Sequence, residues 1–201
     1  WDYHLHAVPP DAPLARRMAI EAAMAIREGG AVEVEEIVAV TMGPEGATRA
    51  LHKAVSLGAD RSLHLCDDAL AGSDVAATGY ALAQALRREQ PDLVLLGQQS
   101  DDGECYTVGA IVADHLQMPS LTQVIKLDVE ASGDGPATLR CERQAEYGYD
   151  TVEVEFPAVV AVGDAINEPR YPSLKAIMGA KKKPLERLSA SELEIDLSRV
   201  G

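Results

Sequence analysis

Short, unbroken apolar runs alternate with helix-like stretches along the first half of the chain, and this alternation constrains its fold more than any other feature. The runs at residues 37–40 and 93–96 are typical of strands buried on both faces, and residues 62–65 are predicted as another strand. Between them, apolar residues at helical spacing predict helices over residues 13–29, 44–57, about 74–89 and about 107–117. Strands that alternate with helices form parallel sheets with right-handed crossovers, so we expect an α/β, Rossmann-like, doubly wound fold.

After Pro119 the pattern changes. Residues 122–130 and 137–145 are predicted as strands joined by a turn at 132–136, and residues 151–155 alternate between apolar and polar side chains. Residues 157–162 again resemble a buried strand. We therefore expect a mostly parallel sheet with an added antiparallel β segment. The tail from Ser189 is acidic and short of apolar residues, so residues 1–185 are expected to form one domain and residues 186–201 to begin a C-terminal extension.

The net charge of −14 argues against nucleic acid and anionic membranes as partners. No apolar run approaches the roughly 18 residues of a membrane span, so direct membrane insertion is not expected. The three cysteines are far apart and none forms a Cys-x-x-Cys pair, which favours a reducing cytoplasm over a disulfide framework or a zinc site. A cationic run, residues 181–183, is either a solvated helix end or part of a docking surface.

Two loops directly follow predicted parallel strands, at the edge where open α/β sheets bind ligands. They are residues 41–44 and residues 97–109, and the second leads into a helix whose free N–H groups could bind an anion. Gly103 would allow close backbone approach, and Ser100 and Thr107 would add hydroxyl groups. The loop acids (Asp101, Asp102 and Glu104) could contact ribose hydroxyls, which makes a nucleotide site, or they could simply cap the helix of an empty loop.

Groups suited to catalysis are sparse. His4 and His6 could bind a metal, but no Cys or acid follows at ligand spacing, so a packed or solvated pair is expected and no metal site is predicted. Cys105 stands at a predicted helix start, where a thiol pKa can fall, but no base accompanies it. Neither a phosphate-binding loop with lysine nor a Ser-His-Asp set is present. The chain therefore resembles a binding or carrier protein more than an enzyme.

Several segments resemble the β (small) subunit of electron-transfer flavoproteins. The most specific is the run from Asn167 to Leu185, with Asn-Glu-Pro-Arg-Tyr at 167–171, Ile-Met at 177–178 and the lysine run. Residues 92–109, 57–61 and 40–44 also match, so the resemblance covers about residues 13–185. It implies an electron carrier subunit that pairs with a larger α subunit, with a redox-active FAD between them that is held mainly by α.

The resemblance also implies a nucleotide in this subunit. The nucleotide is AMP in the ordinary members and a second FAD in a subgroup that bifurcates electron pairs. The matching positions are Met42, Gly97, Gln98, Gln99, Ser100, Asp101, Asp102, Gly103, Glu104, Cys105, Tyr106, Thr107 and Val108. We expect AMP, because the loop acids penalise the charge of a second phosphate, whereas Tyr106 could supply one ring for FAD and Asp102-Gly103-Glu104 resembles the Asp-Gly-Asp of the bifurcating subgroup.

The resemblance assigns partner recognition to one further segment, in which Leu174 would be the apolar anchor. Its residues are Tyr171, Pro172, Ser173, Leu174, Lys175, Ala176, Ile177 and Met178. The implied partners are flavin dehydrogenases of the acyl-CoA dehydrogenase type, which would deliver electrons, and the electron-transfer flavoprotein–quinone oxidoreductase, which would accept them.

The chain departs from the family at its start. The family's first strand, with its Val-Lys-x-Val core, is not recognisable, and Asp2-Tyr3 resembles the remnant after it, so Tyr3 would approach the flavin held by α. The first helix begins Pro13-Leu14 in place of Asn-Pro, which removes an amide that often contacts the nucleotide. A rival interpretation is a stand-alone, nucleotide-binding stress-type protein on a similar sheet, but it gives no reason for the Asn-Glu-Pro-Arg-Tyr segment.

Overall fold

The computed structural model describes residues 2–8, 13–98, 106–133 and 135–200, and its description of side chains begins at residue 17. The helices are α1 (Pro13–Gly29), α2 (Thr48–Leu57), α3 (Val75–Glu89), α4 (Val108–Leu116) and α5 (Leu174–Ala180), with short 3-10 turns at Glu45–Ala47, Asp68–Leu70 and Leu197–Arg199. The strands are β1 (Asp2–Val8), β2 (Glu33–Met42), β3 (Arg61–Leu65), β4 (Leu93–Gly97), β5 (Ser120–Glu130), β6 (Thr138–Ala145), β7 (Gly148–Glu155), β8 (Ala158–Val162) and β9 (Leu185–Leu188).

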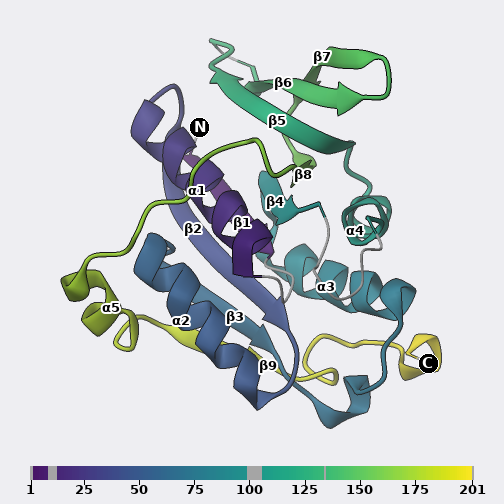
Figure 1. The fold of residues 1–201 in the computed structure, drawn as a ribbon. Coiled ribbons are helices and arrows are strands. Elements are labelled where there is room, and N and C mark those ends of the chain that lie inside the picture. Colours follow the sequence, from purple (N-terminus) through teal and green to yellow (C-terminus); the bar gives the residue numbers. More distant parts are fainter. Residues whose placement is uncertain (1, 9–12, 99–105, 134, 201) are drawn as a thin grey trace.

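The described strands form a single sheet in the order β7-β6-β5-β8-β4-β1-β2-β3-β9. The pairings from β5 through β8 to β9 are parallel, whereas β5–β6 and β6–β7 are antiparallel. In Figure 1 the antiparallel strands extend past the helix-covered part of the sheet, at the top of the view. The predicted fold class, a mostly parallel doubly wound sheet with an added antiparallel segment, is confirmed.

The strands in the middle of the sheet bury alternate side chains on opposite faces. In β2, Ile37 and Ala39 join the core under α1 and α2, while Val38 and Val40 join the core under α3 and α4. Figure 1 shows these two helix pairs on opposite sides of the sheet. Because side chains alternate along a strand, a strand covered on both faces must be apolar at every position, which explains the unbroken runs of the sequence.

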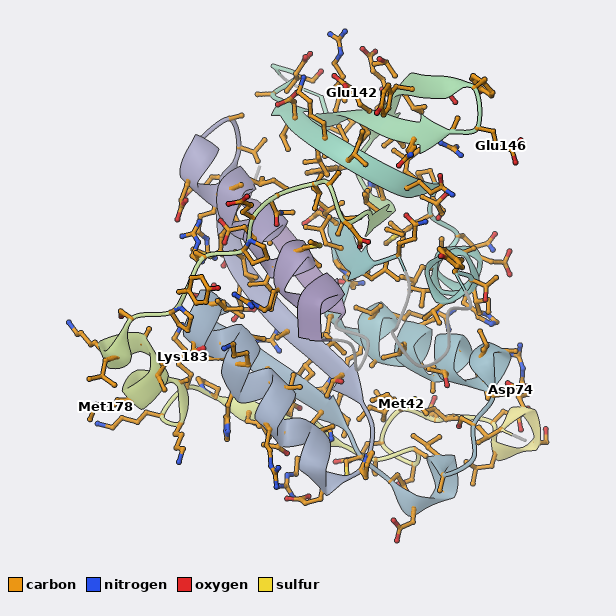
Figure 2. All side chains as sticks on the ribbon, in the orientation of Figure 1. Met42, Asp74, Glu142, Glu146, Met178 and Lys183 are labelled. Atoms are coloured by element: carbon orange, nitrogen blue, oxygen red, sulfur yellow. The ribbon has the colours of Figure 1, made fainter. Side chains whose placement is uncertain are left out.

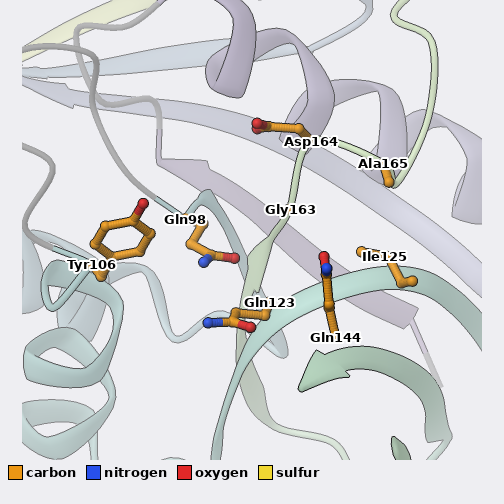
Figure 3. A pocket seen from close by; sticks show the side chains of 8 residues that line it. All are labelled: Gln98, Tyr106, Gln123, Ile125, Gln144, Gly163, Asp164 and Ala165. Atoms are coloured by element: carbon orange, nitrogen blue, oxygen red, sulfur yellow. The ribbon is translucent and has the colours of Figure 1, made fainter. Parts of the chain in front are cut away.

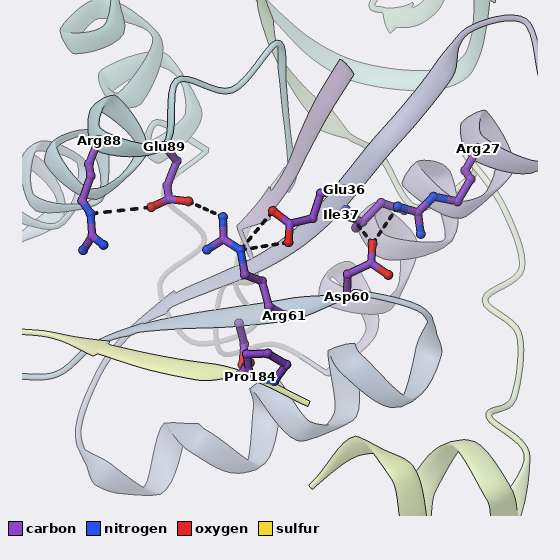
Figure 4. A network of polar contacts seen from close by, with 9 residues as sticks. Arg27, Glu36, Ile37, Asp60, Arg61, Arg88, Glu89 and Pro184 are labelled. Atoms are coloured by element: carbon purple, nitrogen blue, oxygen red, sulfur yellow. Dashed lines mark hydrogen bonds and ion pairs between the residues drawn. The ribbon is translucent and has the colours of Figure 1, made fainter. Parts of the chain in front are cut away.

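The amino-terminal end of the parallel sheet is fixed by ion pairs between neighbouring elements (Figure 4). Arg61 on β3 donates from Nε to both carboxylate oxygens of Glu36 on β2, at 3.0 Å each, and from a terminal nitrogen to Glu89 at the end of α3. Asp60 accepts from Arg27 at 2.6 Å and from the backbone N–H of Ile37 at 2.9 Å. These contacts lie at the amino-terminal ends of the strands, whereas the predicted ligand loops leave the carboxyl ends. They therefore stabilise the scaffold without involving those loops.

The structure has a strand at the start of the chain, where the sequence shows no recognisable strand pattern. The strand β1 lies in the centre of the sheet and pairs in parallel with β2 on one side and β4 on the other. Its sequence, with His4 and His6 at alternate positions, lacks the continuous apolar run that identifies a central strand. Two neighbouring strands supply its backbone partners, and this long-range pairing outweighs the weak local pattern.

The expected boundary between the domain and its C-terminal extension lies after residue 185. It falls inside β9, which pairs in parallel with β3, and the following residues pack on the core beside α3. The buried members of this tail are Leu188, Ala190, Leu193 and Ile195. The tail as far as Ile195 therefore packs as part of this domain, because its few apolar side chains join the core on the α3 and α4 side of the sheet.

None of the described helices is long and apolar enough to cross a membrane.

Candidate functional site

The order of the strands reverses between β1 and β4. From β1 the chain proceeds outward through β2 and β3, and it then returns to the other side of β1 to form β4. Ligands of open α/β sheets bind at such a switch point, outside the carboxyl ends of the strands. Met42 ends β2 and Gly97 ends β4, so the two predicted loops do leave this edge, with β1 between them.

The loop after β2 is held by a histidine that the sequence reasoning did not assign to the site. His64 is fully buried near the end of β3, with Nε2 3.0 Å from the carbonyl oxygen of Gly43 and Nδ1 3.3 Å from the hydroxyl of Thr48. A carbonyl only accepts, so Nε2 carries the proton and donates it. The backbone N–H of Gly43 donates to Leu65 at 3.0 Å, and the turn after Met42 is thereby fixed to β3.

The second loop is described only at its two ends. Gln98 follows Gly97, the last residue of β4, and Tyr106 and Thr107 lead into α4, which begins at Val108. The backbone N–H of Gln98 donates to Val162 at 3.1 Å, which continues the β4–β8 pairing. The other predicted members of the nucleotide site lie outside the described residues: Gln99, Ser100, Asp101, Asp102, Gly103, Glu104 and Cys105. For Tyr3 the structure describes the backbone, within β1.

Helix α4 starts in close contact with the sheet. A Cβ atom added at Gly109 would lie 3.0 Å from Cδ1 of Leu96, so the Leu96 side chain would have to shift slightly to make room for it. Within the described chain, no side chain caps the N-terminus of α4. The N–H groups in the first turn of a helix have no partner within the helix, and such groups can bind an anion.

A polar cleft of about 430 Å³ opens beside this loop, on the side of β8 and β5. Three glutamines from different elements line it, together with Tyr106 and with residues that follow β8: Gln98, Gln123, Gln144, Tyr106, Gly163, Asp164 and Ala165, with Ile125 as an apolar member. Figure 3 shows the three amide side chains and the Tyr106 ring around the opening. Gln98 and Tyr106 are members of the predicted nucleotide site, whereas Met42 is not among the described residues that line this cleft.

Irregular backbone directs two of these side chains. Gln123 has a φ of 58° and Tyr106 a φ of 53°, a conformation that non-glycine residues seldom adopt. Gln123 lies where the pairing of β5 with β8 shifts register between Leu121 and Val124, which is a β-bulge. Bulges commonly redirect side chains at the rim of a site. Gln123 and Gln144 had no sequence signal of function, because a bulge is set by long-range pairing.

The predicted recognition segment lies far from this edge and exposes apolar side chains. Tyr171 is 86%, Leu174 74% and Met178 69% exposed, and Ile177 is half exposed. Ser173 caps α5 by accepting the backbone N–H of Ala176 at 3.1 Å. In Figure 2, Met178 lies on the outer side of α5, away from the sheet. Residues 171–178 are called the docking segment below.

The lysine run after α5 has two different roles. Lys183 donates from Nζ to the carbonyl oxygen of Ala59 at 2.7 Å, so it fixes the end of the segment to the loop before β3. Lys181 and Lys182 are exposed. The sequence left open a solvated helix end and a docking surface, and the structure adds a hydrogen bond to the backbone for Lys183, which is also exposed.

One of the two described cysteines, Cys141, is not suited to nucleophilic chemistry. Cys141 is buried within β6, and burial raises the pKa of its thiol to about 12. Such a thiol stays protonated at neutral pH and is a poor nucleophile.

Comparison with known proteins identifies the family. The model of the electron transfer flavoprotein domain matches residues 13–193. The electron transfer flavoprotein subunit beta of Mycobacterium tuberculosis (strain ATCC 25618 / H37Rv) is 42% identical over 205 residues, which cover all of this chain and 75% of that protein. The subunit of the same name from Thermoanaerobacterium thermosaccharolyticum is 40% identical over 186 residues, or 91% of this chain and 68% of that protein. The one from Megasphaera elsdenii is 34% identical with the same coverage of both chains. The chain therefore belongs to the electron transfer flavoprotein family and resembles its beta subunits along its whole length.

Proposed function

We propose that the chain is the β subunit of a heterodimeric electron carrier. It would take electrons from flavin dehydrogenases such as acyl-CoA dehydrogenases and pass them to a quinone-linked acceptor, the electron-transfer flavoprotein–quinone oxidoreductase. The observation that carries the proposal is the docking segment, which exposes four large apolar side chains on a well-fixed part of the surface. Exposed apolar groups gathered in this way mark sites of protein interaction.

Redox chemistry in such a carrier would come from an FAD held mainly by the larger α subunit. We propose that Tyr3, on the central strand β1, approaches that flavin from this subunit. The cysteines Cys66 and Cys141 are free thiols, which supports the proposed location in a reducing cytoplasm.

The second part of the proposal is an AMP at the switch point between β1 and β4. One cluster of N–H groups at the start of α4, with Thr107 beside it, is enough for one phosphate. Gln99 to Cys105 would complete this site, with the loop acids on ribose hydroxyls. The alternative is a second FAD, as in a bifurcating flavoprotein, and the half-exposed ring of Tyr106 is the observation that favours it.

Co-expression with the gene of a larger subunit tests both parts. The two chains should elute as one yellow complex, and denaturation of that complex should release one FAD and one AMP. Release of two FAD and no AMP would favour the bifurcating alternative. A colourless chain that elutes alone beside a fully flavinated larger subunit would contradict the proposal and favour the stand-alone nucleotide-binding protein.

A further inference from the structure

The docking segment should not keep its shape on its own. Helix α5 has seven residues, and isolated helices of this length are unstable in water. Its large apolar side chains point outward, so they supply little packing energy to hold it. Contacts at the two ends of the segment must therefore fix it.

The contacts at its start converge on Arg170. The Arg170 backbone N–H and Nε donate to one carboxylate oxygen of Glu21, at 3.0 and 2.8 Å, and a terminal guanidinium nitrogen donates to the other at 2.7 Å. The guanidinium also donates to both oxygens of Glu28, at 2.6 and 2.9 Å. One arginine thus binds two carboxylates in bidentate geometry, and we call these three residues the Arg170 cluster. Such paired, charge-assisted contacts fix orientation as well as position.

Helix α1 presents a matching stripe. Residues 17, 21 and 28 are spaced by four and seven positions, which places them on one face of the helix. The Arg17 guanidinium lies 5.2 Å from the centre of the Tyr171 ring, and the side-chain amide of Asn167 donates to the carbonyl oxygen of Met18 at 3.0 Å. The opposite side of α1 packs in the core. The start of the docking segment is therefore fastened to a rigid element about 150 residues away in sequence.

The other end is fixed independently. Lys183 holds the carbonyl oxygen of Ala59, and β9 then joins the sheet edge. Between these two points the segment makes no large contribution to the core, since Ala180 is its buried apolar member among the described residues. Helix α5 also lies against α2, so the order of the segment comes from this packing together with the contacts at its two ends.

We propose that Arg170 is a positioning residue for electron delivery: its bonds to Glu21 and Glu28 hold the docking segment in the orientation in which a flavin dehydrogenase binds it. This inference rests on the proposed function. A segment ordered before binding costs less conformational entropy when a partner immobilises it. Arg170 therefore acts on the encounter of the two proteins, through the segment, and not on the flavin.

The test uses the full chain in complex with its larger subunit and compares Arg170→Gln with Arg170→Lys. The matched control is Arg187→Gln, which removes another surface arginine that pairs with a glutamate, Glu45. Amide hydrogen exchange over residues 171–178 is measured first, without any partner. Electron transfer from an acyl-CoA dehydrogenase is then measured over a range of dehydrogenase concentrations.

In Arg170→Gln, exchange over the segment should become at least about tenfold faster, and the half-saturating dehydrogenase concentration should rise by about tenfold. The limiting rate and the flavin content should stay unchanged. Arg170→Lys should recover part of both effects, because an ammonium group keeps the charge but cannot bind both carboxylates in bidentate geometry. Arg187→Gln should match the wild type.

Unchanged hydrogen exchange in Arg170→Gln would overturn the inference, whatever the kinetics. Faster exchange with an unchanged half-saturating concentration would also overturn it, because the order of the segment would then not matter to the partner. A wild-type heterodimer that accepts no electrons from any dehydrogenase contradicts the proposed function instead. The hydrogen-exchange result would still stand in that case.

Discussion

At the scale of single residues, the side chains that shape the predicted site edge act through buried or paired polar groups. His64 fixes the turn after Met42 through one carbonyl and one hydroxyl. Gly109 lets α4 approach Leu96. Leu174 in the docking segment differs from these residues. Its side chain is largely exposed and therefore contributes little to the stability of the folded chain.

Leu174→Ala should therefore weaken partner binding without weakening the fold. Burial of a leucine in a partner's pocket contributes about 1.5–3 kcal/mol, so the half-saturating dehydrogenase concentration should rise by roughly one order of magnitude or more. The midpoint of urea unfolding should stay that of the wild type. The control is Leu197→Ala, another exposed leucine, and equal kinetics for the two variants would refute the role of Leu174.

At the scale of elements, ion pairs connect neighbouring elements at two places: the amino-terminal ends of the parallel strands and the start of the docking segment. The contacts of Arg61 join β2, β3 and α3, and the Arg170 cluster joins α1 to the segment before α5. Hydrogen bonds to Glu28 and Glu21 raise the pKa of Arg170, so its charge is constant and only the two glutamates can titrate.

We expect the contribution of the Arg170 cluster to the free energy of unfolding to be lost at acid pH. Side-chain hydrogen bonds from Arg170 are the main reason that the pKa of Glu21 and the pKa of Glu28 lie below the ordinary value of a glutamate. A carboxyl pKa lowered by folding stabilises the protein above the unfolded-state pKa, and this contribution is lost as the pH falls through the folded-state pKa. The difference in unfolding free energy between the wild type and Arg170→Gln should therefore be constant above about pH 5.5 and should shrink below about pH 4.5.

Urea unfolding of both proteins from pH 7 to pH 3 measures this difference. The double variant Glu21→Gln with Glu28→Gln serves as the control, because it lacks both titrating groups and should show no such pH dependence relative to its own Arg170→Gln version. A difference that grows toward low pH would have the wrong sign for this cluster.

At the scale of the whole molecule, the sheet extends from the antiparallel strands at one edge to β9 at the other. The tail after β9 packs on the core under α3 and α4. Asp67 accepts the backbone N–H of Ala69 at 3.0 Å and that of Ala190 at 2.9 Å, and the Tyr80 hydroxyl accepts the backbone N–H of Asp196 at 3.1 Å. Residues on both sides of the expected boundary are thus joined by hydrogen bonds.

Leu188→Ala should consequently destabilise the entire domain. Leu188 is 2% exposed at the end of β9, and truncation of a buried leucine costs about 2–5 kcal/mol. Urea unfolding followed by circular dichroism should show one transition at a lower midpoint. Arg187→Ala, at the exposed neighbouring position, should change the free energy of unfolding by no more than about 0.5 kcal/mol. A separate early transition that leaves the main midpoint unchanged would show that the tail is an independent arm.

Local patterns of residues were enough to predict several elements of the fold. The strand at residues 37–40 and the helices α1 and α3 follow from apolar spacing and caps such as Asp74, which accepts the N–H of Ala77 at 2.8 Å. The Asn-Glu-Pro-Arg-Tyr segment indicated the family. Met42 and Gly97 lie at the carboxyl ends of β2 and β4, as parallel strands that end together require, while every predicted nucleotide and flavin contact, at Tyr3, Met42 and residues 97–108, stays a prediction.

Other features of the fold and of the sites depend on contacts between segments that are far apart in the sequence. The strands β1 and β9 form because neighbouring strands offer backbone partners, although their own sequences carry weak strand patterns. Gln123 and Gln144 reach a common cleft through a bulge and an antiparallel pairing. Arg170 finds Glu21 across 149 positions of the chain. In each case the energy comes from groups far apart in sequence, and no local pattern of residues records which of them the fold will bring together.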